Sequence, residues 1–333
     1  MPTIKSPPAK PFKQRPALGD YTETIVTSPK TSSGKRSSPN TRKASHPGEL
    51  LKTYPNGVTV LQVPSFQKFP WLVHGFSTSP GGVSSLHSKK VLNLGFTEWD
   101  DRANVKKNRR LFLAAIQAEG LALTPLKQFH SDVVCAFDSA PGAICNGDAS
   151  ITRTPDLVLG IQTADCVPVL LVDPKIRAVA AIHAGWRGTL QRIVEKTIGR
   201  MVMEFGSRPS DLVAAIGPAI GGCCYEVGTE VASAFHSQFT QASEWFDELR
   251  TGDEPNPLQW LNQFPPGHQP RPKNVRLDLG KANRAQLINK GVRAENLFVS
   301  ELCTSCRPDL LFSYRKDGAE SGRMMSVIGI RAD

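Results

Sequence analysis

Three short apolar runs follow one another closely in the middle of the chain and limit the folds available to it. They are Leu157–Gln162, Val167–Val172 and Ala178–His183, and they are rich in Val, Leu and Ile. Runs of this length and composition are typical of strands buried on both faces. Thr189–Phe205 follows with its apolar residues on one helical stripe, which predicts a helix packed against those strands.

Strand and helix patterns alternate in the rest of the chain. Asn56–Val63 and Met324–Ile330 have strand composition, Arg102–Ala118 and Ala282–Lys290 have helical spacing, and Phe76–Ser84 is rich in Gly, Pro and Ser, as in a loop. Closely spaced strand pairs mixed with helices predict an α/β fold with a mixed α+β sheet.

Charge divides the 333 residues into a tail and a single domain. Residues 1–46 hold nine Lys or Arg and two acids, so +7 of the net +10 lies there and +3 remains for the rest. Residues 1–47 have too few large apolar side chains to offset the entropy of folding, which predicts a disordered basic tail. The domain is then 48–333, with an insert loop at about 244–273, and its small net charge predicts no nucleic-acid partner.

Cysteine usage and hydropathy indicate the compartment. No run approaches the ~18 apolar residues of a membrane span, and the tail lacks the apolar segment of a secretory signal. Seven cysteines, two of them adjacent, suggest a reduced compartment rather than a disulfide framework. We expect a cytoplasmic protein with no membrane partner; the basic, Ser-rich tail leaves an organelle transit peptide open. Cys303 and Cys306 form a lone CxxC, with no second CxxC to complete a four-thiolate zinc site.

Cys166 directly precedes the apolar run Val167–Val172, and His183 ends the run Ala178–His183, so both lie at the ends of the runs away from the turn that joins them. A two-residue turn at Pro174-Lys175 makes the numbers of opposed residues add to 349, so that Cys166 faces His183. Opposed side chains have Cβ atoms about 4.5–5.5 Å apart, which suits a shared metal or a proton transfer. The alternative is a small buried thiol and a hydrogen-bonded core histidine.

Charged neighbours strengthen the functional interpretation. Asp165 precedes the cysteine, and Arg187 lies between Gly185 and Gly188 just before a predicted helix. A helix N-terminus and an arginine can together bind phosphate or carboxylate, although Arg187 could equally form a surface salt bridge.

Ten separate motifs in order resemble the laccase-domain family, described as multicopper polyphenol oxidoreductase-like and also as purine nucleoside phosphorylases. The motifs are HGFST at 74–78, GGVS at 81–84, LNLG at 92–95, QFHS at 128–131, TADC at 163–166, HAGWRG at 183–188, IGPAIG at 216–221, CYEV at 224–227, ANRA at 282–285 and FSYR at 312–315. The resemblance implies a mixed α/β fold that is distantly similar to the catalytic domain of bacterial toxins that act as cysteine hydrolases.

The resemblance also implies the site. His130, Cys166 and His183 would bind one zinc as catalytic residues, with a fourth position open. Arg187 and Arg315 are candidates for phosphate, and Asn93 and Gln128 for sugar or base. Asp165 would orient a zinc ligand through a hydrogen bond.

Two positions depart from the family pattern. Ser79-Pro80 replaces an arginine that usually follows HGFST, and Gly221-Gly222 precedes Cys223 and Cys224 where Gly-Pro is frequent. If the missing arginine holds phosphate or substrate, another residue must replace it.

Several functions remain open. The resemblance implies zinc-dependent phosphorolysis of adenosine or inosine to base and ribose 1-phosphate, with methylthioadenosine and adenosine deamination as further activities. The partners would be nucleoside and phosphate, and the family suggests a homodimer. One alternative is a cysteine hydrolase with Cys166 as nucleophile and His183 as base, acting on an amide such as a peptidoglycan precursor.

A copper-dependent polyphenol oxidase is the third enzymatic alternative. No two of the seven histidines are separated by a single residue, so the His-x-His pairs of a trinuclear copper cluster are missing. A site of two histidines and one cysteine could still take copper. A binding protein that docks through its basic tail is a further alternative, but the presence of all three ligands argues against it.

Overall fold

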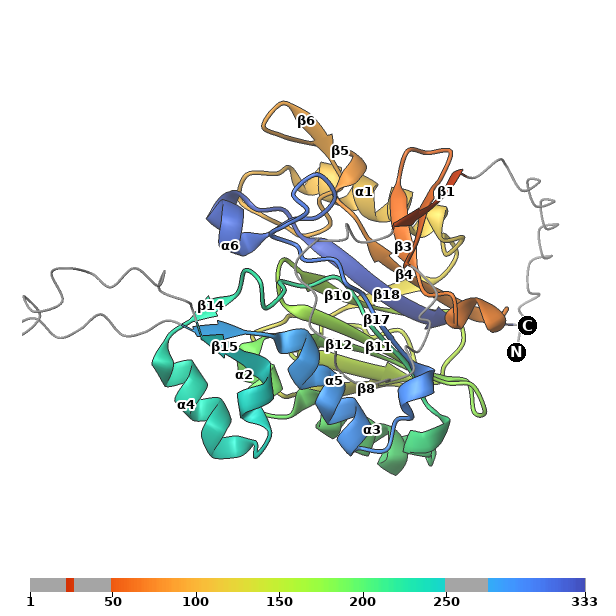
Figure 1. Cartoon of the computed structure of the whole chain (residues 1–333). Coiled ribbons are helices and arrows are strands. Elements are labelled where there is room, and N and C mark those ends of the chain that lie inside the picture. Colours follow the sequence, from red (N-terminus) through yellow and green to blue (C-terminus); the bar gives the residue numbers. More distant parts are fainter. Residues whose placement is uncertain (1–21, 27–48, 249–274, 333) are drawn as a thin grey trace, which may run out of the picture.

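The computed structural model describes residues 22–26, 49–248 and 275–332 (Figure 1). Its largest sheet has seven strands in the order β1-β2-β3-β4-β18-β10-β7. Their bounds are β1 Thr22–Val26, β2 Glu49–Thr53, β3 Thr59–Gln62, β4 Leu72–Ser77, β18 Met324–Ile330, β10 Leu157–Thr163 and β7 Ala122–Pro125. All pairs are antiparallel except β10 with β7. This sheet joins the two ends of the described chain.

A second sheet of six strands carries the candidate site. Its order is β17-β13-β11-β12-β9-β8. The bounds are β17 Leu297–Val299, β13 Val213–Ile216, β11 Val167–Asp173, β12 Ala178–Ala184, β9 Ala149–Thr152 and β8 Val134–Phe137. β13 runs parallel to β17 and β8 runs parallel to β9, whereas the central pairs are antiparallel. The expected mixed α/β architecture is therefore confirmed.

Six α-helices lie around the two sheets in the described chain. They are α1 (Arg102–Ala115), α2 (Trp186–Leu190), α3 (Ile193–Phe205), α4 (Thr229–Gln238), α5 (Leu279–Asn289) and α6 (Tyr314–Asp317). Smaller sheets pair β5 (Pro80–Leu86) with β6 (Lys89–Val91), and β16 (Val275–Leu277) with β14 (Glu226–Val227) and β15 (Phe246–Glu248). Figure 1 shows α1 beyond the large sheet and α3 and α5 beyond the second one.

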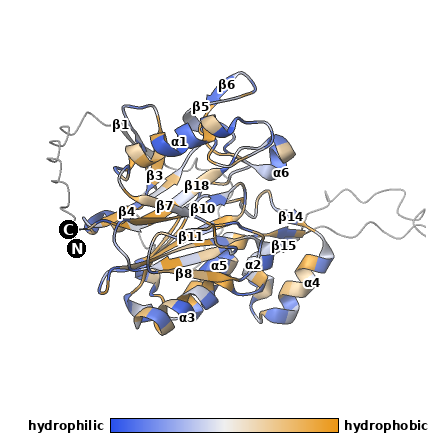
Figure 2. Ribbon diagram, turned by 180° about the vertical axis from the view of Figure 1, so that it is seen from behind, coloured by the Kyte–Doolittle hydropathy of each residue, from blue (hydrophilic) through white to orange (hydrophobic). Residues whose placement is uncertain are grey.

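Three buried clusters explain this layering. One cluster fills the space between the sheets and includes Leu159, Leu170 and Ile328. A second packs α3 and α5 on the six-stranded sheet, and a third packs α1 on the seven-stranded sheet. Because β11, β12 and β18 are buried along their whole length, and β10 at every position except Gln162, these strands are largely apolar without alternation. Figure 2 shows this as hydrophobic colour along the strands.

The strands beside the site begin and end within two residues of the predicted positions, but one helix prediction was wrong. The helix expected over Thr189–Phe205 is two helices, α2 and α3, that meet at Arg192. Arg192 adopts a left-handed conformation with φ 63°. The Thr189 carbonyl accepts the Arg192 N–H at 3.0 Å and the Gln286 side-chain amide at 2.7 Å. Apolar spacing does not reveal such a break, because both helices present their apolar stripe to the same sheet.

One loop prediction was also wrong, and the predicted tail and insert lie mostly outside the described residues. The segment expected as a loop, Phe76–Ser84, contains the end of β4 and most of β5. The tail contributes β1, which pairs with β2, whereas 1–21 and 27–47 lie outside the described residues. The proposed insert is described only at 244–248, where it forms the end of a 3₁₀ turn and β15.

Cysteine pairing differs from the expectation of fully reduced thiols. Cys135 and Cys145 form a disulfide across a 10-residue separation, and the other five cysteines are free. Cys135 lies on β8, and Cys145 lies on the loop that leads to β9. The two cysteines are close because β8 and β9 are adjacent strands. Among the described helices, none is long and apolar enough to cross a bilayer.

Candidate metal centre

The hairpin of β11 and β12 places Cys166 and His183 on one face. The expected register was wrong, because Pro168 rather than Cys166 lies opposite His183, and the turn holds four residues, 174–177. Arg177 closes it with φ 50°. The shift amounts to two residues, which preserves the face of every side chain. Cys166 and His183 are therefore diagonal neighbours rather than directly opposed.

His130 completes a compact group of three side chains. The candidate ligand atoms of His130, Cys166 and His183 all lie within 4.8 Å of one another, and the His130 Nε2 to Cys166 Sγ distance is 3.8 Å. The two imidazole rings meet edge to face, with centroids 5.0 Å apart. His130 sits on the loop after β7 with φ 62°, a left-handed conformation that turns its ring toward the hairpin. We call these three residues the triad.

Asp148, which sequence reasoning missed, holds two members of the triad in place. Its Oδ1 lies 2.8 Å from His183 Nδ1 and accepts the backbone N–H of His130 at 3.0 Å. Its Oδ2 accepts the backbone N–H and the hydroxyl of Ser131, each at 2.6 Å. The Asp148 carbonyl also accepts the His183 N–H at 2.7 Å. A histidine whose second nitrogen meets a carboxylate is typical of metal ligands.

The electrostatics of the group favour negative charge on the thiol. Burial would raise the pKa of Cys166, but the charge of His183 and the hydrogen bonds from both imidazoles lower it below its ordinary value. Burial would also lower the pKa of His183, but the Cys166 thiolate and Asp148 raise it. Burial would raise the pKa of Asp148, yet hydrogen bonds from His183 and Ser131 hold it well below its usual range. The side chains are therefore arranged to stabilise an ionised Cys166, the state in which sulfur binds a metal or attacks an electrophile.

Gly185 lies against two side chains of the triad, Cys166 and His130. A Cβ placed there would come within 3.0 Å of both Cys166 Sγ and His130 Cδ2. Only a residue without a side chain leaves both ligand groups where they are.

We expect Gly185→Ala to displace Cys166 and His130 and to lower metal affinity by about 10- to 100-fold, the loss typical of misplaced ligands. Metal content per chain after gel filtration measures this. Gly199→Ala, on the open side of α3 where nothing lies within 4 Å of the added carbon, is the matched control and should retain its metal. Equal metal content in the two variants would contradict the assignment.

Asp165 contacts other loops than expected. Its φ is 90°, and its carboxylate accepts 2.5 Å hydrogen bonds from the Thr304 hydroxyl and the Arg315 N–H. Asp148 therefore occupies the orienting position that we expected for Asp165. Asp165 instead fastens the 304 and 315 loops next to Cys166.

Cationic side chains surround the triad. Arg187 is exposed at the start of α2 with its guanidinium 4.3 Å from the Trp186 ring, and the described residues show no ion pair for it. Arg315 lies over the Tyr225 ring at 5.1 Å and donates to the Glu226 carbonyl at 2.9 Å. Tyr225 experiences the charges of Cys166, Arg315 and Arg187, and its pKa is raised to about 12, chiefly by burial. The phosphate candidates thus share one neighbourhood with the triad.

Arg323 is a further cation that sequence reasoning missed. Its guanidinium lies 5.4 Å from the Tyr314 ring, and the charges of Asp165 and Cys166 act on it. Burial lowers its pKa. Ser79, which stands where the family usually has arginine, is buried and pairs its backbone with Leu310 and Leu92. Arg323 therefore supplies, close to the site, a positive charge that Ser79 cannot supply.

Asn93 and Gln128 use their amides inside the protein. Asn93 is fully buried, donates to the side chains of Thr97 and Asp100, and accepts the Arg323 N–H at 2.9 Å. Gln128 exchanges two hydrogen bonds with the Gln162 backbone, at 2.8 and 2.7 Å. In this structure both residues fix the backbone around the site, and no amide group of Asn93 is left for a substrate.

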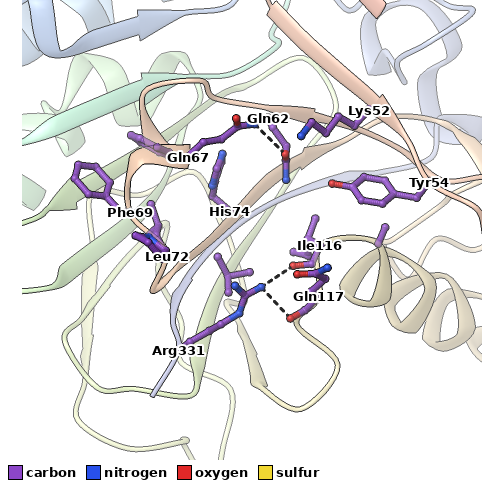
Figure 3. Close-up of a pocket in the computed structure, with 14 residues that line it drawn as sticks. Lys52, Tyr54, Gln62, Gln67, Phe69, Leu72, His74, Ile116, Gln117 and Arg331 are labelled. Atoms are coloured by element: carbon purple, nitrogen blue, oxygen red, sulfur yellow. Dashed lines mark hydrogen bonds between the residues drawn. The ribbon is translucent and has the colours of Figure 1, made fainter. Parts of the chain in front are cut away.

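A cavity of about 280 Å³ lies away from the triad (Figure 3). His74 from the first family motif lines it, with Gln62, Tyr54 and Arg331. None of the triad residues or candidate phosphate ligands borders this cavity. His74 Nε2 accepts the Val63 N–H at 3.0 Å, and its ring meets Phe66 edge to face. His74 therefore connects β3 and β4 as a buried neutral imidazole.

Burial lowers the pKa of His74 from 6.5 to about 3. Above pH 6.5 neither the folded nor the unfolded chain protonates this group, whereas at lower pH only the unfolded chain does. The free energy of unfolding should therefore fall by up to ~1.4 kcal/mol per pH unit below 6.5. Urea unfolding of wild type and His74→Gln, which cannot titrate, measures the effect. Parallel pH profiles for the two proteins would contradict it.

Comparisons with known proteins identify the family. A family model described as "Multi-copper polyphenol oxidoreductase laccase" matches residues 73–331, which include the whole triad. The chain belongs to this family. It is 37% identical over 274 residues to "Purine nucleoside phosphorylase" of Deinococcus radiodurans, covering 82% of this chain and 94% of the relative. It is 36% identical over 285 residues to "Purine nucleoside phosphorylase YlmD" of Geobacillus stearothermophilus, covering 80% and 92%.

Solved structures agree with this membership. The fold matches the hypothetical protein YfiH of Bacillus licheniformis with a TM-score of 0.70 and 31% identity, covering 82% of this chain and 96% of that one. It also matches YlmD from Geobacillus stearothermophilus with a TM-score of 0.66 and 31% identity, with the same coverage. The relatives named as purine nucleoside phosphorylases support an enzyme of that kind. The groups of His and Cys side chains in this chain could hold a metal ion.

Proposed function

We propose that the protein is a zinc-dependent purine nucleoside phosphorylase that converts adenosine or inosine and phosphate to base and ribose 1-phosphate. The observation that carries the proposal is the triad beside Arg187 and Arg315, in a chain whose relatives bear that name. One site would then combine ligands for a metal ion with arginine side chains that can bind phosphate.

The donor chemistry fits zinc. His130, Cys166 and His183 supply two imidazoles and one thiol whose pKa is lowered, and Asp148 fixes the nitrogen of His183 that faces away. Three protein ligands leave a fourth position for substrate, as in catalytic zinc sites. Zinc bound there would act as a Lewis acid that polarises an oxygen of the substrate. The same donors could also take copper.

The protein's own groups would bind and orient the reactants. Arg187 and Arg315 neutralise phosphate, and their contacts with Trp186 and Tyr225 limit the motion of each guanidinium. Asp165 fastens the backbone of Arg315 next to Cys166. Holding phosphate and nucleoside together lowers the barrier through proximity and orientation.

Arg187→Ala should raise the KM for phosphate about 10- to 100-fold, because a charge-assisted hydrogen bond contributes about 1.5–3 kcal/mol. The KM for inosine should change much less. Initial rates at varied phosphate measure the effect. Arg200→Ala, on α3 where Arg200 pairs with Glu204, is the control and should resemble wild type. An unchanged KM for phosphate in Arg187→Ala would remove this residue from the proposal.

The test of the reaction compares adenosine, inosine and methylthioadenosine with and without phosphate. Phosphorolysis predicts release of free base only with phosphate. Adenosine deamination, which we propose as an additional activity, predicts inosine and ammonia from adenosine without phosphate. Absence of turnover of all three nucleosides by the zinc-loaded protein would refute the proposal.

A second candidate rests on the same atoms. Cys166, His183 and Asp148 are also arranged as the nucleophile, base and orienting carboxylate of a cysteine hydrolase. A cysteine hydrolase acting on amides is therefore the alternative. A thiolate that binds zinc cannot serve as a free nucleophile. Metal removal should therefore abolish a phosphorylase and activate a cysteine hydrolase.

A further inference from the structure

A second group of cysteines lies on two loops that are distant in sequence. Cys223 and Cys224 lie in the turn between β13 and β14, and Cys303 and Cys306 follow β17. β13 and β17 are parallel neighbours, so the chain leaves both strands at the same edge of the sheet. The lone CxxC of the sequence thus meets a Cys-Cys pair about 80 residues earlier, which spacing did not reveal.

Backbone contacts hold the two loops together. Ala219 and Cys303 form a parallel bridge, and the Thr304 N–H donates to the Ala219 carbonyl at 3.0 Å. The Gly221 N–H donates to Cys303 Sγ at 3.2 Å, and the Gly221 carbonyl accepts the Cys224 N–H in a tight turn. The turn lets two adjacent cysteines face the same point, which an extended strand would not allow.

The four sulfur atoms are spaced as ligands of one ion. All lie within 4.8 Å of one another, with Cys223–Cys224 and Cys223–Cys306 at 3.6 Å and Cys224–Cys306 at 3.4 Å. Four sulfurs around an ion with metal–sulfur bonds of about 2.3 Å lie about 3.8 Å apart. The observed spacing is far longer than the ~2.05 Å of a disulfide, and the four cysteines are free.

We propose that Cys223, Cys224, Cys303 and Cys306 bind a structural zinc ion, separate from the triad. Four thiolates close the coordination sphere, so this ion has no open position for a substrate. Soft thiolate ligands select zinc over magnesium or calcium. The proposal does not depend on the phosphorylase activity.

The ion would also stabilise the walls of the candidate active site. Thr304, between two of the ligands, donates to Asp165, and Tyr225, directly after Cys224, contacts Arg315. The four-thiolate site therefore joins the two loops that hold residues adjacent to Cys166.

Metal content of the full-length protein tests the proposal. We expect two zinc ions per chain in wild type and one in Cys306→Ser. His130→Ala/His183→Ala should also retain one, because it keeps all four thiolates. Ser305→Ala, on the same loop but without a ligand atom, is the control and should retain two. If Cys306→Ser fails to fold, the double histidine variant decides by itself.

Cobalt loaded into the double histidine variant gives a second readout. Four thiolates predict an intense sulfur-to-cobalt charge-transfer band and visible bands typical of tetrahedral cobalt, which Cys223→Ser in the same background should lose. No metal in the double histidine variant would overturn the proposal. A mass of the native wild-type protein showing disulfides among these four cysteines would also overturn it, whether or not the protein cleaves nucleosides.

Discussion

Replacing Cys166 by alanine is expected to remove the metal ion from the triad and to lower kcat for phosphorolysis at least ~1,000-fold. A catalytic metal contributes several kcal/mol to the transition state, and each ~1.4 kcal/mol corresponds to a factor of ten in rate. Cys166 supplies the only thiolate of the triad, and the two imidazoles left behind form an incomplete site. Steady-state kinetics with inosine, together with zinc content per chain, measures both effects.

Histidine variants separate loss of the site from general damage. His130→Ala should behave as Cys166→Ala does. His236→Ala removes an exposed histidine on α4 that stacks on Phe246 and belongs to neither group of candidate metal ligands, and it should retain full activity. Wild-type rates in Cys166→Ala with normal folding would contradict a catalytic role for the triad.

Asp148→Asn is expected to weaken both the metal site and the fold. The buried carboxylate accepts hydrogen bonds from His183, His130 and Ser131, and an amide in its place must turn an N–H₂ group toward some of these donors. Loss of a ligand's carboxylate partner typically costs 10- to 100-fold in metal affinity. Removing one member of a buried pair should lower the free energy of unfolding by about 3 kcal/mol.

Urea unfolding and zinc titration against a competing chelator measure these two changes. Asp132→Asn is the matched control, because Asp132 directly follows Ser131, a partner of Asp148, but forms a partly exposed ion pair with Lys196. Asp132→Asn should lower the free energy of unfolding by less than about 1 kcal/mol. Similar values for the two variants would show that Asp148 does not organise the site.

The sequence predicts the central strands well, because burial on both faces leaves a continuous apolar composition in β10, β11 and β12. Two features could not be predicted. The break between α2 and α3 depends on the left-handed Arg192 and on a cap supplied by Gln286 from α5. The hairpin register depends on how many residues the turn contains, which Asp173-Pro174 did not determine.

The site shows the same division. Local motifs give Cys166 and His183, and the family resemblance adds His130. Asp148 is found only in three dimensions, because its role arises from the pairing of β9 with β12. The four-thiolate group likewise needs the parallel pairing of β13 with β17. Asn93 has the composition of a substrate ligand, but its burial shows that it fixes the backbone instead.

The most direct test of the account is the product balance of inosine and phosphate with the purified full-length protein. We predict equal amounts of hypoxanthine and ribose 1-phosphate, with no hypoxanthine when phosphate is omitted. Free ribose in place of ribose 1-phosphate, or no hypoxanthine from protein whose triad holds zinc, would contradict the assignment of this chain as a purine nucleoside phosphorylase.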